Sequence, residues 1–122
     1  MRYIIELSFN LQLGSSYTYL RSLITDMCEN NEVVDYYFMT ESEGVGNKIH
    51  KNHCVASITV ENRAQLDTII YHIKHIKKVY IDCIYTDDST SRIKYASPYY
   101  IKTKMTKEGQ EKYMLEPDKI SF

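Results

Sequence analysis

The residues best suited to ligand binding are cations and tyrosines gathered in one block near the end of the chain. Residues 92–107 contain no acid and hold Arg92, Lys94, Tyr95, Tyr99, Tyr100, Lys102, Lys104 and Lys107. Cations neutralise phosphates and tyrosine rings stack on bases, so this composition predicts contacts with single-stranded nucleic acid. An edge strand protected from aggregation by lysines has the same composition. The block therefore indicates either nucleic-acid binding or an ordinary edge strand.

Histidines and cysteines form a second group of candidates. His72 and His75 lie three positions apart in a predicted helix, a spacing at which two imidazoles can begin a metal site. They lie toward the polar side of that helix, and no standard ligand signature surrounds them. We therefore expect surface histidines, with no metal and no cofactor. Cys28, Cys54 and Cys83 are widely spaced and are interpreted as buried thiols in a reducing compartment.

One further set of residues resembles the centre of HUH endonucleases. It consists of Glu43, His50, His53 and the segment Tyr71-His72-Ile73-Lys74. The resemblance implies that Tyr71 attacks a DNA phosphate, while a metal held by His50 and His53 polarises that phosphate. No nucleophile, base and orienting group stand at a recognisable spacing elsewhere in the sequence. The sequence thus favours a non-enzymatic protein, with single-stranded DNA nicking by Tyr71 as the alternative.

These residues are positioned by segments with clear periodicity. Alternating and helical apolar patterns predict strand 3–9, helix 17–28, strand 33–40, strand 54–60, helix 62–76 and strand 79–85. This order predicts an α+β, ferredoxin-like βαββαβ sandwich, in which two helices cover one face of a four-stranded antiparallel sheet. Residues 1–88 form this predicted core. Residues 89–122 form a C-terminal extension that packs on the core or on a partner chain.

The extension and the second sheet face lead to a prediction about assembly. Residues 92–104 read as extended, with Pro98 at an edge, and residues 106–115 as a short helix. Alternation places a mixed apolar and acidic set on the sheet face without helices: Ile4, Glu6, Ser8, Asp35, Tyr37, Met39, Val55, Ser57, Thr59, Tyr80, Asp82 and Ile84. Large exposed apolar patches mark interaction sites. A homodimer is therefore expected, with Lys94, Lys102 or Lys104 neutralising the acids, whereas an extension folded over its own sheet would leave a monomer.

The first strand and the central hairpin also resemble RNA recognition motifs. The segment from Tyr3 to Leu11 is similar to their first-strand motif, and the hairpin from Val33 to Val60 has a matching length. The resemblance implies the ferredoxin-like fold. That family stacks bases on aromatic residues of its first and third strands, but the matching positions here are Ile4 or Glu6 and Val55 and Ser57. The expected likeness is therefore one of fold, without RNA binding on the sheet.

Length and composition set the broad class of the protein. The chain has 122 residues, enough for one domain, and a formal net charge of −1 gives no general attraction to nucleic acid. No apolar stretch approaches the roughly 20 residues that cross a bilayer, so an intracellular location without membrane contact is expected. The abundance of Ile, Lys and Asn suggests a viral or phage source. These features favour an interaction module for protein or nucleic acid, with no small-molecule substrate, and a purely structural, oligomer-forming protein is the other alternative.

Overall fold

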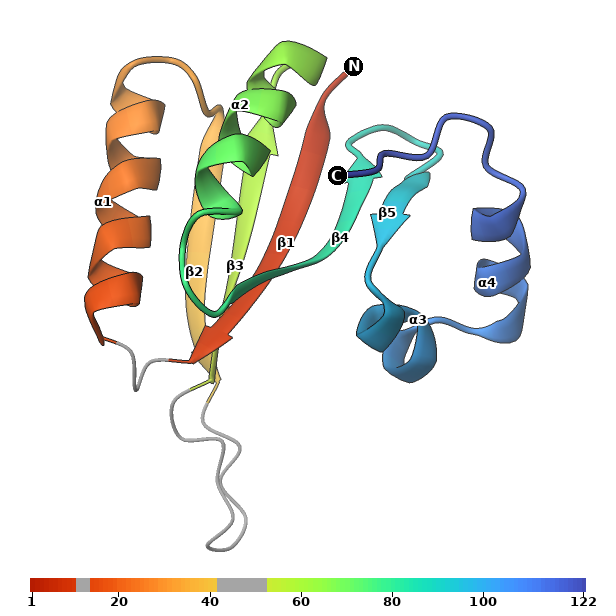
Figure 1. The fold of residues 1–122 in the computed structure, drawn as a ribbon. Helices are drawn as coiled ribbons and strands as arrows, with labels where there is room; N and C mark the ends of the chain where they lie inside the picture. The colour runs from red at the N-terminus through yellow and green to blue at the C-terminus, as the bar shows by residue number, and fades with distance from the viewer. Residues whose placement is uncertain (11–13, 42–52) are drawn as a thin grey trace, which may run out of the picture.

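The protein forms an α+β unit built on one antiparallel sheet. The computed structural model describes residues 1–10, 14–41 and 53–122. Within them the elements are β1 (Tyr3–Asn10), α1 (Gly14–Glu29), β2 (Asp35–Glu41), β3 (His53–Val60), α2 (Arg63–Ile73), β4 (Val79–Thr86), β5 (Ile93–Ala96), α3 (Pro98–Lys104) and α4 (Lys107–Met114). The strand order is β2-β3-β1-β4-β5 (Figure 1). The predicted α+β class is confirmed, but the sheet has a fifth strand that the four-stranded prediction lacks.

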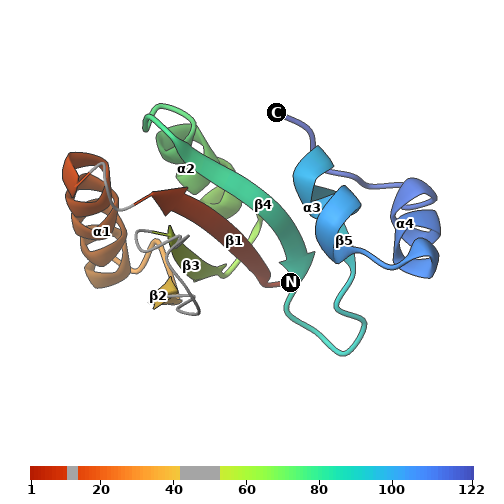
Figure 2. The same ribbon diagram turned by 90° about the horizontal axis from the view of Figure 1, so that it is seen from below.

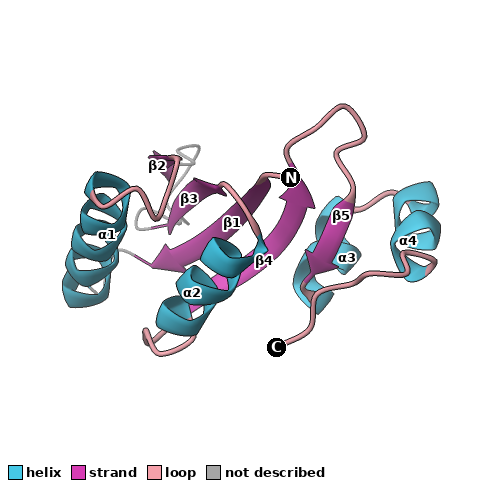
Figure 3. Cartoon of the chain, turned by 90° about the horizontal axis from the view of Figure 1, so that it is seen from above, coloured by secondary structure: helices cyan, strands magenta, loops and turns pink. Residues whose placement is uncertain are grey.

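Helices α1 and α2 cover one face of this sheet, as Figure 3 shows from above. Alternate residues of β1 and β3 point toward the helices and are fully or almost fully buried, as the repeating burial pattern of both strands shows. They join the apolar stripes of the two helices in one core: Ile5, Leu7, Phe9, Leu20, Ile24, Met27, Cys54, Ala56, Ile58, Val60, Leu66, Ile69, Ile70 and Ile73. Helix α2 is capped by Asn62, whose Oδ1 accepts a hydrogen bond from Gln65 N at 2.9 Å.

A β-bulge in β4 changes which side chains reach the core. Glu6 pairs with Cys83 and Leu7 pairs with Ile81, so Asp82 is an extra residue on the β4 side. The alternation therefore reverses beyond Asp82. Ile84, predicted on the helix-free face, is fully buried in the core, whereas Cys83 faces the opposite side beside Glu6.

The C-terminal segment continues the same sheet and then turns into two helices. β5 pairs with β4, and Ser97 caps α3 by accepting a hydrogen bond from Tyr100 N, with Pro98 in the first helical turn. The prediction of an extended segment up to residue 104 is wrong beyond Ala96, because a serine followed by proline is a strong helix start. The predicted helix near residues 106–115 is present as α4. Figure 2 shows α1 and α4 at opposite ends of the molecule.

The end of the chain returns to the core side of the sheet. Ile120 is 3% exposed within the core cluster, and its backbone N–H donates to the carbonyl oxygen of Lys94 at 2.8 Å. Phe122 packs on the half-buried ring of Tyr95, with ring centroids 4.6 Å apart. The segment after β4 therefore contributes both a strand and core contacts. Among the described residues, no helix has the length and apolar character needed to cross a membrane.

Candidate interaction face

The sheet face opposite α1 and α2 is divided into two halves. The covered half consists of Cys83, Lys94 and Ala96 on β4 and β5, all of them less than 9% exposed. The open half lies on β2, β3 and β1 and consists of Tyr37, Met39, Val55, Ser57, Thr59, Ile4 and Ser8. The C-terminal helices lie beside β5, at the end of the sheet farthest from α1 (Figure 1). They therefore cover one half and leave the other.

Helix α3 covers its half of the face by placing Tyr100 against Cys83. The Tyr100 hydroxyl interacts with the Cys83 thiol, and Cys83 Sγ donates to Glu6 Oε2 at 3.4 Å. Burial and the negative charge of Glu6 raise the pKa of the Cys83 thiol far above its usual range. The same two causes, burial first, raise the pKa of Tyr85 to about 12. The Cys83 thiol and the Tyr85 hydroxyl therefore stay protonated at neutral pH.

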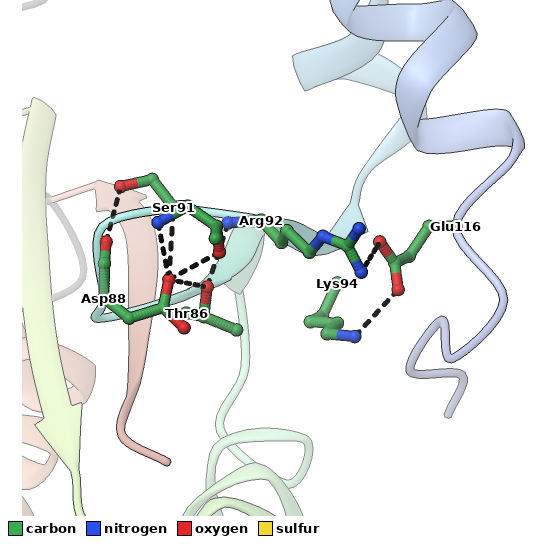
Figure 4. Close-up of polar contacts among 7 residues, drawn as sticks. Thr86, Asp88, Ser91, Arg92, Lys94 and Glu116 are labelled. Carbon is green, nitrogen blue, oxygen red and sulfur yellow. Dashed lines mark hydrogen bonds and ion pairs between the residues drawn. The ribbon is translucent and has the colours of Figure 1, made fainter.

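Two ion pairs fasten the end of α4 to β5. Lys94 Nζ lies 2.8 Å from Glu116 Oε1, and Arg92 lies 3.7 Å from Glu116 Oε2 (Figure 4). The side chains of Lys94 and Glu116 are only 10% and 7% exposed. The hydrogen bond from Lys94 is the main cause that lowers the pKa of the Glu116 carboxyl. The carboxylate therefore holds the helical part of the C-terminal segment on the sheet.

The turn between β4 and β5 is also tied by its own side chains. Asp88 Oδ1 accepts hydrogen bonds from Thr86 Oγ1 at 3.1 Å and from Ser91 N at 3.1 Å, and Arg92 N donates to Thr86 Oγ1 at 2.9 Å (Figure 4). Hydrogen bonds, first of all from Thr90, lower the pKa of the Asp88 carboxyl. This turn fixes the direction in which β5 returns along β4.

The open half keeps exposed apolar side chains. Tyr37 is 63% exposed and Met39 is 41% exposed, on the edge strand β2. Ile4, Val55 and Thr59 are half-buried beside them. Helices α1 and α2, which contact β2 and β3, pack on the core face. The predicted composition of this face is thus found on β1, β2 and β3 and at Tyr80 of β4, which is 58% exposed, whereas beyond the bulge Cys83 replaces Ile84.

The structure divides the predicted nucleic-acid residues between two roles. Arg92 and Lys94 bind Glu116, while Tyr95 and Tyr100 pack on the core and on Cys83. The remaining four residues of the set are exposed: Tyr99, Lys102, Lys104 and Lys107. Tyr99 is 67% exposed. Half of the predicted site therefore serves the fold, and the rest is confined to α3 and the start of α4.

The candidate catalytic residues are described only in part. Glu43 and His50 lie outside the described residues, and so does the side chain of His53, the first residue of β3. Tyr71 is 64% exposed on α2, with its ring centroid 4.8 Å from that of His75 and 5.6 Å from that of His72. Within the described part of the chain, no group of three or more His, Cys, Asp or Glu side chains could hold a metal ion.

Sequence reasoning missed the residues that build the covered half. Cys83 and Tyr85 reach this face because of the bulge, which simple alternation cannot reveal, and Tyr100 reaches it because α3 is a helix. The only signal for α3 is the Ser97-Pro98 pair. No family model matches the chain, and no curated protein or solved structure shows significant similarity to it.

Proposed function

We propose that the chain is a non-enzymatic interaction module that pairs with a second copy of itself through the open half of the sheet. One observation carries this proposal: the C-terminal helices cover β5 and the Cys83 part of β4 but leave exposed the apolar side chains of β2 and Tyr80 at the start of β4. A symmetric pair needs only one self-complementary patch, and apolar patches on one sheet face are well suited to face-to-face packing.

The arrangement of charge supports a particular orientation of the two copies. Asp35 is exposed at the β2 side of the face, and Lys102 and Lys104 are exposed on α3 at the opposite side. Among the described residues, none of these three side chains forms an ion pair. A two-fold axis parallel to the strands brings β2 of each copy toward α3 of the other, so the acidic side of one copy faces the basic side of its partner.

We infer further that residues 1–86 are a ferredoxin-like unit to which β5 has been added. The element order β-α-β-β-α-β and the strand order β2-β3-β1-β4 support this inference. In such a unit the helix-free face is the surface that a partner can reach. The added strand and α3 reduce that surface to β1, β2, β3 and the start of β4, where Tyr80 is exposed.

Light scattering coupled to size exclusion tests the proposed pairing. We expect the chain at micromolar concentration to have twice the 14.4 kDa mass of one chain. The double variant Tyr37→Ser, Met39→Ser should elute as a folded monomer, because it removes the two most exposed apolar side chains of β2. Tyr71→Ser is the matched control, since Tyr71 and Tyr37 are 64% and 63% exposed but lie on different surfaces.

A charge exchange tests the orientation. Asp35→Lys should weaken the pair, and adding Lys102→Glu and Lys104→Glu to it should restore pairing. A wild-type mass of one chain at all concentrations would overturn the proposal itself. If the charge exchange failed to restore pairing, while Tyr37→Ser, Met39→Ser still abolished the wild-type dimer, only the proposed orientation would be overturned.

A further inference from the structure

A groove between α1 and α2 gathers tyrosine rings from both helices and cationic side chains from the end of α2 and the turn after it. The α1–α2 groove has a volume of about 450 Å³, and its walls include Tyr19, Tyr71, His72, His75 and Lys77. It lies on the helix side of the molecule, so the open half of the sheet takes no part in it. None of its lining residues is acidic. The groove thus combines exposed aromatic rings with positive charge, the pairing that binds an aromatic anion.

The rings of the groove are arranged for stacking. Tyr19 is 59% exposed and Tyr71 is 64% exposed, so each presents a ring face to a ligand. The imidazole of His75 is tilted against the Tyr71 ring, with 4.8 Å between ring centroids. Ile76, which belongs to the buried core, also lines the groove. A planar base can therefore stack on a tyrosine whose position is supported by a histidine in the turn that follows α2.

One nitrogen of the His75 ring already has a hydrogen-bond partner. Its Nδ1 lies 2.7 Å from the backbone carbonyl oxygen of Tyr71. A carbonyl oxygen can only accept a hydrogen bond, so Nδ1 carries the proton of the pair. Nε2 is therefore the nitrogen available to a ligand, and it donates to an anion when the ring is doubly protonated.

Positive charge borders the groove from the end of α2 and from the N-terminus of α1. Residues 71–78 contain Lys74, Lys77 and Lys78 and no acid. Among the described residues, none of these lysines forms an ion pair. Ser16 lies in the first turn of α1, a turn without acidic residues, where the helix dipole adds partial positive charge. A phosphate is the anion that matches this setting, because it accepts several hydrogen bonds and carries full negative charge.

We propose that the α1–α2 groove binds a nucleoside phosphate, with the base stacked on Tyr71 or Tyr19 and the phosphate held by Lys77 and His75. The nucleoside phosphate has two sources, a free mononucleotide and a nucleotide of a single strand. The competing explanation is that the lysines only stabilise the C-terminal end of α2, where cations oppose the helix dipole. That explanation predicts no ligand.

Nuclear magnetic resonance titration of the 15N-labelled full chain tests the proposal. The probes are adenosine 5′-monophosphate, adenosine, inorganic phosphate and a 5′-phosphorylated oligothymidylate. We expect the nucleotide to shift the amide signals of residues 71–77 and to bind more tightly than adenosine or phosphate alone. An oligonucleotide that binds more tightly than the mononucleotide identifies a strand as the source, and equal affinities identify the free nucleotide.

Variants separate this groove from the exposed basic residues of α3. Tyr71→Ala and Lys77→Ala should each weaken binding by about tenfold, whereas Tyr71→Phe should retain it because stacking needs only the ring. Tyr99→Ala and Lys107→Ala are matched controls, with a tyrosine 67% exposed and a lysine exposed outside the groove. Three results would overturn the proposal: no shift with any nucleotide, equal affinity for inorganic phosphate, or an equal loss in the control variants.

Discussion

The two halves of the helix-free sheet face differ in what lies over them. On the covered half, Cys83 and Ala96 are 0% and 4% exposed, because the chain itself supplies α3. On the open half, Tyr37 and Met39 keep 63% and 41% of their surface in water. Both halves belong to one continuous sheet, whose strands are covered by the C-terminal segment at one side and left open at the other. The difference indicates that the C-terminal segment limits the open part of this face as well as completing the fold.

The largest expected effect tests the bulge that separates the two halves. Ile84→Ala should lower the free energy of unfolding by about 2–5 kcal/mol, because Ile84 is fully buried in the core. Ile4→Ala removes the same atoms from the half-buried Ile4 of the open half and should cost about 1 kcal/mol or less. Urea denaturation of dilute protein measures both. Equal losses would show that Ile84 does not occupy the core.

The next effect concerns the ion pair between Lys94 and Glu116, which holds the C-terminal segment on the covered half. The pKa of Glu116 is lowered in the folded chain, mainly by the hydrogen bond from Lys94. Its contribution to stability is therefore present above the unfolded pKa of about 4.3 and is lost as the pH falls through the lower folded value. Glu116→Gln should lower the urea midpoint at pH 6, and the gap to wild type should close toward pH 3.

A matched variant controls for ordinary surface charge. Glu108 pairs with Lys112 on α4, but both side chains are almost 80% exposed, at 79% and 78%. Glu108→Gln should leave the urea midpoint nearly unchanged at every pH, because exposed ion pairs contribute little. If Glu116→Gln and Glu108→Gln behaved alike, Glu116 would not be holding the C-terminal segment on the sheet.

The smallest effect is a local one beneath α3. In a Cys28→Ser background, Tyr100→Ala should speed thiol labelling of Cys83 by about tenfold, the change that ~1.4 kcal/mol of lost local stability produces. Cys54 is fully buried on the other face of the sheet and is the internal reference. Mass spectrometry assigns the label to each cysteine. Equal acceleration of Cys54 would mean that the variant loosens the whole fold.

The sequence predicted those features that depend on local periodicity. The alternation in β1 and β3 and the stripes of both long helices are reproduced by buried residues such as Ile5, Ile58 and Leu66. The cap formed by Asn62 was also predictable, because capping needs only two residues at a fixed spacing.

The candidate site was less predictable, because it depends on long-range contacts. The bulge at Asp82 arises from pairing with β1, and nothing within β4 itself reveals it. In the sequence Lys94 has the appearance of a free cation, because its ion-pair partner, Glu116, lies more than twenty residues later in the chain. The residues of the α1–α2 groove come from two helices that are far apart in the sequence, so no local motif unites Tyr19 with Tyr71.

The measurement that tests the central claim most directly is an isotope-filtered nuclear Overhauser experiment on mixed labelled and unlabelled chains. It detects only contacts between two copies. Pairing through the open half in the proposed orientation predicts intermolecular signals from the Met39 methyl group and the Tyr37 ring to side chains of α3 of the partner copy. Intermolecular signals confined to other surfaces, or no such signals at millimolar concentration, would contradict the account.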